Sequence, residues 1–147
     1  MRARTLILLV GLLLLGSVAS AAEPIVIGEI NPLTGALALL GQSGRQGITL
    51  AVEEQNAQGA IGKRPVPLLS RDDEGKPERA LAAAEELTGR RGAVALIGGP
   101  VDTLVGPVSE VADRARVPYL ATASLIQNGR HVVVYPAERA TVPPSTR

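Results

Sequence analysis

Short apolar runs alternate along the chain with longer stretches in which apolar residues recur at helical spacing. Four apolar runs predict β-strands, at residues 25–30, 66–69, 94–97 and 118–121. Three stretches between them predict helices, at residues 44–56, 77–88 and 104–112. The strand segments are apolar on both faces, which is typical of parallel strands buried between helix layers. The pattern therefore predicts an α/β fold, an open three-layer parallel sheet in strand order 2-1-3-4.

The N-terminus follows a different pattern. Two arginines precede an apolar run over residues 6–15, and small residues up to Ala22 follow it. This order of charge, apolar run and small residues is that of a secretory signal peptide. The run is about half of the roughly 20 residues that a spanning helix needs, which favours a cleaved signal over a permanent anchor. We therefore expect residues 1–21 to direct export to the periplasm, with cleavage after Ala21 or Ala22.

The alternation is lost again near the C-terminus. Residues 128–147 contain three prolines and lack a sustained apolar period, although residues 131–135 could form a short strand. We interpret 128–147 as an irregular tail, with an aberrant C-terminus as one explanation. Residues 22–127 are then predicted to form one folded lobe.

Composition narrows the function classes. The chain has no cysteine, which excludes a disulfide bond and a lipid-modified cysteine at the cleavage site. Without Arg2 and Arg4 the chain carries 13 basic and 14 acidic residues, a net charge of −1, which argues against nucleic-acid binding. His131 is the single histidine, and no serine lies in a nucleophile elbow, so neither a metal site nor a catalytic triad is indicated. We expect a binding protein without a cofactor rather than an enzyme.

Ligands of open α/β sheets bind beyond the carboxyl ends of the strands, near the point where the strand order reverses. That rule selects the loops over 31–44, 98–104 and 122–125, which are rich in small and hydroxyl residues. Their backbone N–H groups and the positive ends of the following helices would stabilise a carboxylate or a similar anion. Within the second loop, Asp102 is either a helix N-cap or a polar ligand contact.

Two other features have more ordinary interpretations. Gly41, Gly44 and Gly47 do not match the spacing of a phosphate-binding loop, which favours loop and helix-packing roles. Asp72 and Asp73 follow the second strand at one side of the sheet, where a solvated turn is favoured over an acid–base pair or a metal site.

Six short motifs then follow one another in a specific order. They are Ile25-Val26-Ile27-Gly28, Pro32-Leu33-Thr34-Gly35, Gly47 with Ala51-Val52-Glu53-Glu54, Asn56 and Gly59, Asp72-Asp73 before Pro77, Leu96-Ile97-Gly98-Gly99-Pro100, and Val117-Pro118-Tyr119-Leu120. Together they cover about residues 23–125. Their order and spacing resemble the first lobe of periplasmic substrate-binding proteins of the branched-chain amino acid (leucine-binding) type.

The resemblance implies two α/β lobes with a ligand cleft between them, and the permease of an ABC importer as partner. It implies ligand contacts at six positions of this chain, namely Leu40, Asp102, Thr103, Ala123, Ser124 and Leu125. Leu40 stands where an aromatic residue is common, Leu125 where a threonine is common, and Asp102 near a common serine. These departures leave amides and aromatic acids open as ligands besides amino acids.

Members of this family run to several hundred residues, so the chain corresponds to one lobe and is interpreted as truncated. Two alternatives to an importer component stay open. One is a ligand-sensing receptor domain, because the same lobe occurs in receptors. The other is a fragment that binds little or nothing, because one wall of a cleft supplies only part of the contacts.

Overall fold

The structure, a computed structural model, describes residues 22–123 and 132–134. Its elements along the chain are β1 (Ile27–Asn31), α2 (Ala38–Ala57), β2 (Leu68–Asp72), α3 (Pro77–Glu85), the π-helical turn η1 (Glu86–Arg90), β3 (Ala95–Gly98), α4 (Asp102–Ala115), β4 (Tyr119–Ala121) and β5 (Val132–Val134). All neighbouring strands pair in parallel, in the order β2-β1-β3-β4-β5. The predicted α/β class and the order 2-1-3-4 of the first four strands are confirmed.

The fifth strand lies inside the segment that the sequence predicts as a tail. Val132–Val134 pair with β4 from Tyr119 to Ala121, which agrees with the short strand allowed over residues 131–135. The other residues of the predicted tail, and the predicted signal peptide over 1–21, lie outside the described residues.

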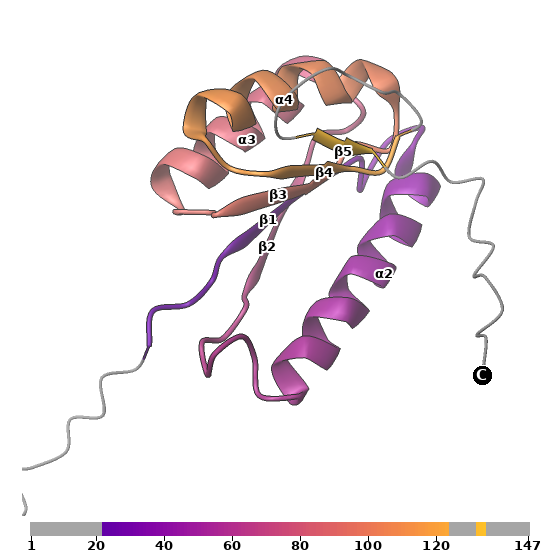
Figure 1. Cartoon of the computed structure of the whole chain (residues 1–147). Coiled ribbons are helices and arrows are strands. Elements are labelled where there is room, and N and C mark those ends of the chain that lie inside the picture. The colour runs from indigo at the N-terminus through magenta and orange to yellow at the C-terminus, as the bar shows by residue number, and fades with distance from the viewer. Residues whose placement is uncertain (1–21, 124–131, 135–147) are drawn as a thin grey trace, which may run out of the picture.

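The sheet has two unequal faces (Figure 1). α3, η1 and α4 cover one face, and α2 runs along the other. The main core lies on the first face, where Ile30, Leu96 and Tyr119 of the strands are buried against Leu87 of η1 and Leu104 of α4. The second face is thinner, since Gly41 is the one fully buried residue of α2.

The expectation that all strands are apolar on both faces is wrong for β1. Glu29 and Asn31 are buried on the α2 side of that strand, with exposed fractions of 0% and 2%. Arg45 of α2 lies 4.0 Å from the Glu29 carboxylate, measured from Nε to Oε2. A buried charge is tolerated in a sheet where hydrogen-bond donors surround it, and this one has them.

α2 begins at Ala38, earlier than the glycine-rich sequence predicts. Gly41 is buried where the helix crosses the loop after β1, and a Cβ there would overlap the Pro32 carbonyl. The glycine therefore permits a close helix–loop contact, which confirms its predicted packing role. At Gly47, by contrast, a Cβ would meet nothing within 4 Å, so packing does not require that glycine.

The edge strand β2 is fastened to η1 by an ion pair. Arg71 Nη2 lies 2.6 Å from Glu86 Oε1, and its Nε donates to Glu86 Oε2 at 2.9 Å. Arg91 donates to the same carboxylate at 3.1 Å. These hydrogen bonds lower the pKa of Glu86 to about 2. The charged side chain of Arg71 on an edge strand also discourages pairing with a further chain.

Candidate functional site

Three loops meet at the carboxyl ends of the parallel strands. The N–H of Gly99, which follows β3, donates to the Ile30 carbonyl of β1 at 3.1 Å. The N–H of Thr122, which follows β4, donates to the Gly98 carbonyl at 2.9 Å. The ends of β1, β3 and β4 are therefore tied into one rim, as the strand-order rule predicts. We call this edge the rim; it comprises the loops over 32–37, 99–101 and 122–123 and the first turns of α2 and α4.

Two glycines make the middle of the rim possible. Gly98 and Gly99 have φ values of +132° and +65°, which side chains rarely adopt. A Cβ at Gly98 would overlap the Ile30 carbonyl, and a Cβ at Gly99 would overlap the Tyr119 hydroxyl. The turn from β3 toward α4 can therefore lie flat on its neighbours because neither residue has a side chain.

Asp72 holds the loop after β1 against the end of β2. Its Oδ1 accepts from the N–H groups of Leu33 at 2.8 Å, Thr34 at 3.3 Å and Glu74 at 2.9 Å. Its Oδ2 accepts from Thr34 Oγ1 at 2.6 Å. Burial acts to raise the pKa of Asp72, but the hydrogen bonds from Thr34, Glu74 and Leu33 outweigh it and lower that pKa. Asp72 thus positions a rim loop.

The neighbouring aspartate is buried, so the predicted solvated turn is wrong for Asp73. Its side chain has an exposed fraction of 0%. Oδ1 accepts from the Gly75 N–H at 2.7 Å, while Oδ2 has no hydrogen-bond partner within the described part of the chain. Burial and the nearby Asp72 charge raise the pKa of Asp73. Burial, with a contribution from the Asp73 charge, also raises the pKa of Tyr119.

A pH-dependent stability follows from Asp73. Because its pKa is raised in the folded protein, it stabilises the fold most in acid, and that contribution is lost as the pH rises through the folded-state pKa. Asp73→Asn removes this dependence. The stability of the variant relative to wild type should therefore improve between about pH 4 and pH 7. Urea unfolding at both pH values measures this, with the exposed Asp113→Asn as control; an equal effect at both pH values contradicts the prediction.

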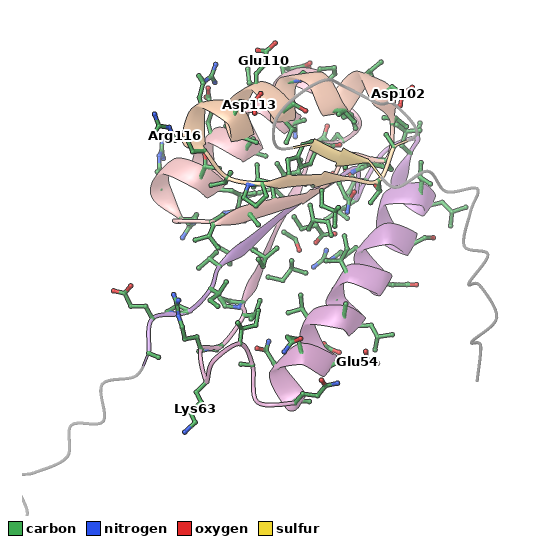
Figure 2. All side chains as sticks on the ribbon, in the orientation of Figure 1. Glu54, Lys63, Asp102, Glu110, Asp113 and Arg116 are labelled. Carbon is green, nitrogen blue, oxygen red and sulfur yellow. The ribbon has the colours of Figure 1, made fainter. Side chains whose placement is uncertain are left out.

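The structure places four of the six predicted ligand contacts. Asp102 and Thr103 are the first two residues of α4 and are exposed at the rim (Figure 2). Leu40 lies in the first turn of α2 and is 47% exposed. Ala123, two residues after β4, is buried, with 2% of the residue exposed, so it offers little surface to a ligand. The other two positions, Ser124 and Leu125, lie outside the described residues.

Asp102 was predicted to be either a helix N-cap or a ligand contact, and the structure excludes the first. The N-cap of α4 is Val101, and no side-chain hydrogen bond caps the helix. The capping interpretation is therefore wrong, because Asp102 already has helical geometry. Its exposed carboxylate lies in the first turn of α4, at the positive end of the helix dipole.

A buried polar network lies behind the rim and was missed by sequence reasoning. Asn31 Nδ2 donates to Glu29 Oε1 at 2.8 Å, and Ser70 of β2 donates to Glu29 Oε2. Asn31 also lies over Gly98, whose Cβ would fall 3.1 Å from Asn31 Oδ1. The network therefore connects β2 with β1 just below the rim, and Asn31 lies next to β3 at Gly98. A glutamate inside an otherwise apolar strand was the one signal for it.

Clusters of metal ligands and surface hollows are the other features that could mark a site among the described residues. No group of three or more potential metal ligands occurs among them. A hollow lined by Ala82, Glu85, Glu86 and Arg90 lies on α3 and η1, away from the rim. Among the helices that the structure describes, none has the length and apolar character needed to cross a bilayer. The fold and the rim together define an open α/β lobe with its loops gathered at the carboxyl ends of the strands.

Comparison with known proteins identifies the family. Residues 24–141 match the periplasmic binding protein family, so the chain belongs to it. The match extends beyond residue 127, where the sequence predicts the lobe to end. Members and structural neighbours are substrate-binding proteins rather than enzymes.

Two relatives illustrate the similarity. An amino acid binding protein of Pseudomonas aeruginosa is 34% identical over 103 residues, which cover 70% of this chain and 28% of the relative. A Leu/Ile/Val-binding protein homolog of Brucella abortus is 34% identical over 100 residues, which cover 68% of this chain and 25% of the relative. The chain therefore spans about a quarter of the length of these relatives.

Solved structures agree with the fold. The branched-chain amino acid transporter substrate-binding protein LivJ from Streptococcus pneumoniae, in complex with isoleucine, has a TM-score of 0.73 at 22% identity. The match covers 76% of this chain and 33% of LivJ, and at this identity it shows the fold alone. A substrate-binding protein from Desulfitobacterium hafniense in complex with Leu has a TM-score of 0.62 at 30% identity, over 76% of this chain and 34% of that protein.

Proposed function

We propose that the chain is an extracytoplasmic solute-binding component of an ABC importer for amino acids or related amides and aromatic acids. The rim carries this proposal, because it joins three loops at the place where α/β sheets bind ligands. The names of the relatives support the amino acid class and imply a permease as partner. The signal pattern in residues 1–21 supports a periplasmic location.

The ligand would contact the rim through few groups of this lobe. Thr103 offers a hydroxyl, and the first turn of α4 offers a positive dipole end to a carboxylate. Leu40 offers an exposed apolar surface. The proposed contacts at Ala123, Ser124 and Leu125 complete the set.

One lobe supplies one wall of a cleft, so binding by this chain alone is expected to be weak. A ligand that is covered on one side keeps roughly half of its contacts, and the loss of closure lowers the affinity further. Titration of residues 22–147 by calorimetry and by amide NMR should show dissociation constants of about 1 mM or weaker. Amide shifts confined to the rim support the proposed site. Absence of rim shifts with every amino acid, amide and aromatic acid tested would overturn it.

Charge at Asp102 gives a sharper test of the site. Its carboxylate repels a ligand carboxylate held at the start of α4, so Asp102→Asn should strengthen binding of an amino acid. At an exposed position, removal of this repulsion corresponds to about a two- to fivefold gain in affinity. Glu110→Gln is the matched control, because Glu110 is an exposed acid on the same helix, away from the rim (Figure 2). Equal effects of both variants would show a long-range charge effect and contradict a contact at Asp102.

A further inference from the structure

The outward face of α2 carries two strongly exposed leucines among polar residues. Leu39 is 81% exposed and Leu50 is 57% exposed, although α2 fully buries Gly41 alone. Surface helices normally turn their apolar side to the core and their charged side to solvent. α2 therefore exposes two leucines on the side that a surface helix usually turns to solvent with polar residues alone.

The two leucines lie on one side of α2, with small residues between them and with Gln46 and Glu53 at the flank. Leu39, Ser43, Gly47 and Leu50 are spaced by four, four and three residues, which places them on one side of the helix. All four are exposed. We call them the α2 stripe. The single charge between Leu39 and Leu50 is Arg45, and it is directed toward the sheet, where it lies 4.0 Å from Glu29.

The ends of α2 carry charges that do not match its dipole. The first turn contains no acidic residue and the last turn contains no basic residue. Instead, Glu53 and Glu54 lie in the C-terminal half, near the negative end of the dipole (Figure 2, Glu54). The helix would gain from an anion at its N-terminal end and from a positive potential near these glutamates.

We propose that the α2 stripe is a self-association surface through which two copies of this chain form an antiparallel dimer. In that arrangement Leu39 of each copy packs against Leu50 of the other. Ser43 of each copy lies opposite Gly47 of the other, and these small residues let the helices approach closely at the centre. The pairing is the same in both directions, as a two-fold symmetric interface requires.

The antiparallel direction also satisfies both helix ends. Glu54 of one copy comes beside the start of α2 in the other copy, close to Ala36. A carboxylate at a helix N-terminus is favourable, and each copy supplies the charge that the other lacks. A parallel pair would instead place the two Glu54 side chains together. This charge complementarity favours a second copy of the chain as the occupant of the stripe.

Sedimentation equilibrium of residues 22–147 tests the proposal. We expect a concentration-dependent dimer, and Leu50→Glu should raise its dissociation constant by about 10- to 100-fold, as expected for loss of a buried leucine. Val94→Glu is the matched control, because Val94 is a half-exposed apolar residue remote from α2, and it should leave the dimer intact. Circular dichroism of both variants verifies that the fold is retained.

Cysteine cross-linking tests the direction of the helices, since the chain has no cysteine of its own. A mixture of Ser43→Cys and Gly47→Cys chains should form the disulfide-linked dimer more completely than either variant alone. A Cβ at Gly47 meets no neighbour within the lobe, so that variant is expected to fold. A monomer at all concentrations up to about 0.5 mM overturns the dimer. If Leu50→Glu and Val94→Glu weaken the dimer equally, α2 is not the interface. If Ser43→Cys chains cross-link with one another faster than with Gly47→Cys chains, the helices are not antiparallel.

Discussion

Gly98→Ala is expected to lower the free energy of unfolding by at least about 3 kcal/mol. Two costs add at this position. The backbone has a φ of +132°, which is a conformation that alanine adopts only with strain. The new methyl group would also overlap the Ile30 carbonyl of the adjacent strand, and a strand backbone cannot rotate away as a side chain can. Urea unfolding followed by circular dichroism measures the change.

Gly89→Ala is the matched control for this substitution. Gly89 lies in η1, has no positive φ, and a Cβ there would meet nothing within 4 Å. Replacement should leave stability unchanged or raise it by up to about 1 kcal/mol, because alanine restricts the unfolded chain. Similar losses for both variants would show that the close contact at Gly98 does not determine the cost.

Glu29→Gln is expected to cost about 2–3 kcal/mol of stability. The substitution keeps the shape of the side chain but replaces one acceptor oxygen by an N–H₂ group. Ser70 must then turn its hydroxyl to accept from the amide, so its hydrogen bond to a carboxylate is lost, and the attraction of Arg45 is lost as well. All of this happens where the side chain is fully buried, so water cannot compensate.

Glu53→Gln is the control on the exposed side of α2, and it should change stability by less than about 0.5 kcal/mol. Thermal unfolding of both variants, followed by urea unfolding at neutral pH, provides the comparison. An unchanged free energy of unfolding in Glu29→Gln would mean that the buried network contributes little to the fold. It would also mean that the alignment of β1 with β2 and β3 rests on the backbone ladder alone.

Much of the fold could be predicted from the sequence because its signal is periodic. Apolar strands followed by amphipathic helices determine a parallel sheet, and the first four strands have the predicted order. The start of α2 could not be predicted in this way. Gly41 weakens the helix signal locally, yet it is needed where the helix crosses Pro32, and that contact depends on tertiary structure.

The candidate site was predictable in its place but not in its construction. The strand-order rule selected the loops after β1, β3 and β4, and backbone hydrogen bonds do tie them together. The roles of Asp72 and Asp73 differ although they are adjacent, since one fastens a loop and the other is buried without a partner for Oδ2. Sequence reasoning treated them alike because burial depends on the direction of each side chain from the end of β2.

The two unequal faces of the sheet imply two levels of local stability within one lobe. Opening free energies follow the amount of apolar surface that an element buries, so the layer of α3 and α4 should separate from the sheet only in global unfolding. α2 is held by the contacts of Gly41 and by the Glu29 network rather than by a broad apolar core. α2 is therefore the element expected to detach first. A structural unit bound to the outer side of α2 would hold the helix on the sheet, and would slow hydrogen exchange of the backbone amides across the whole sheet.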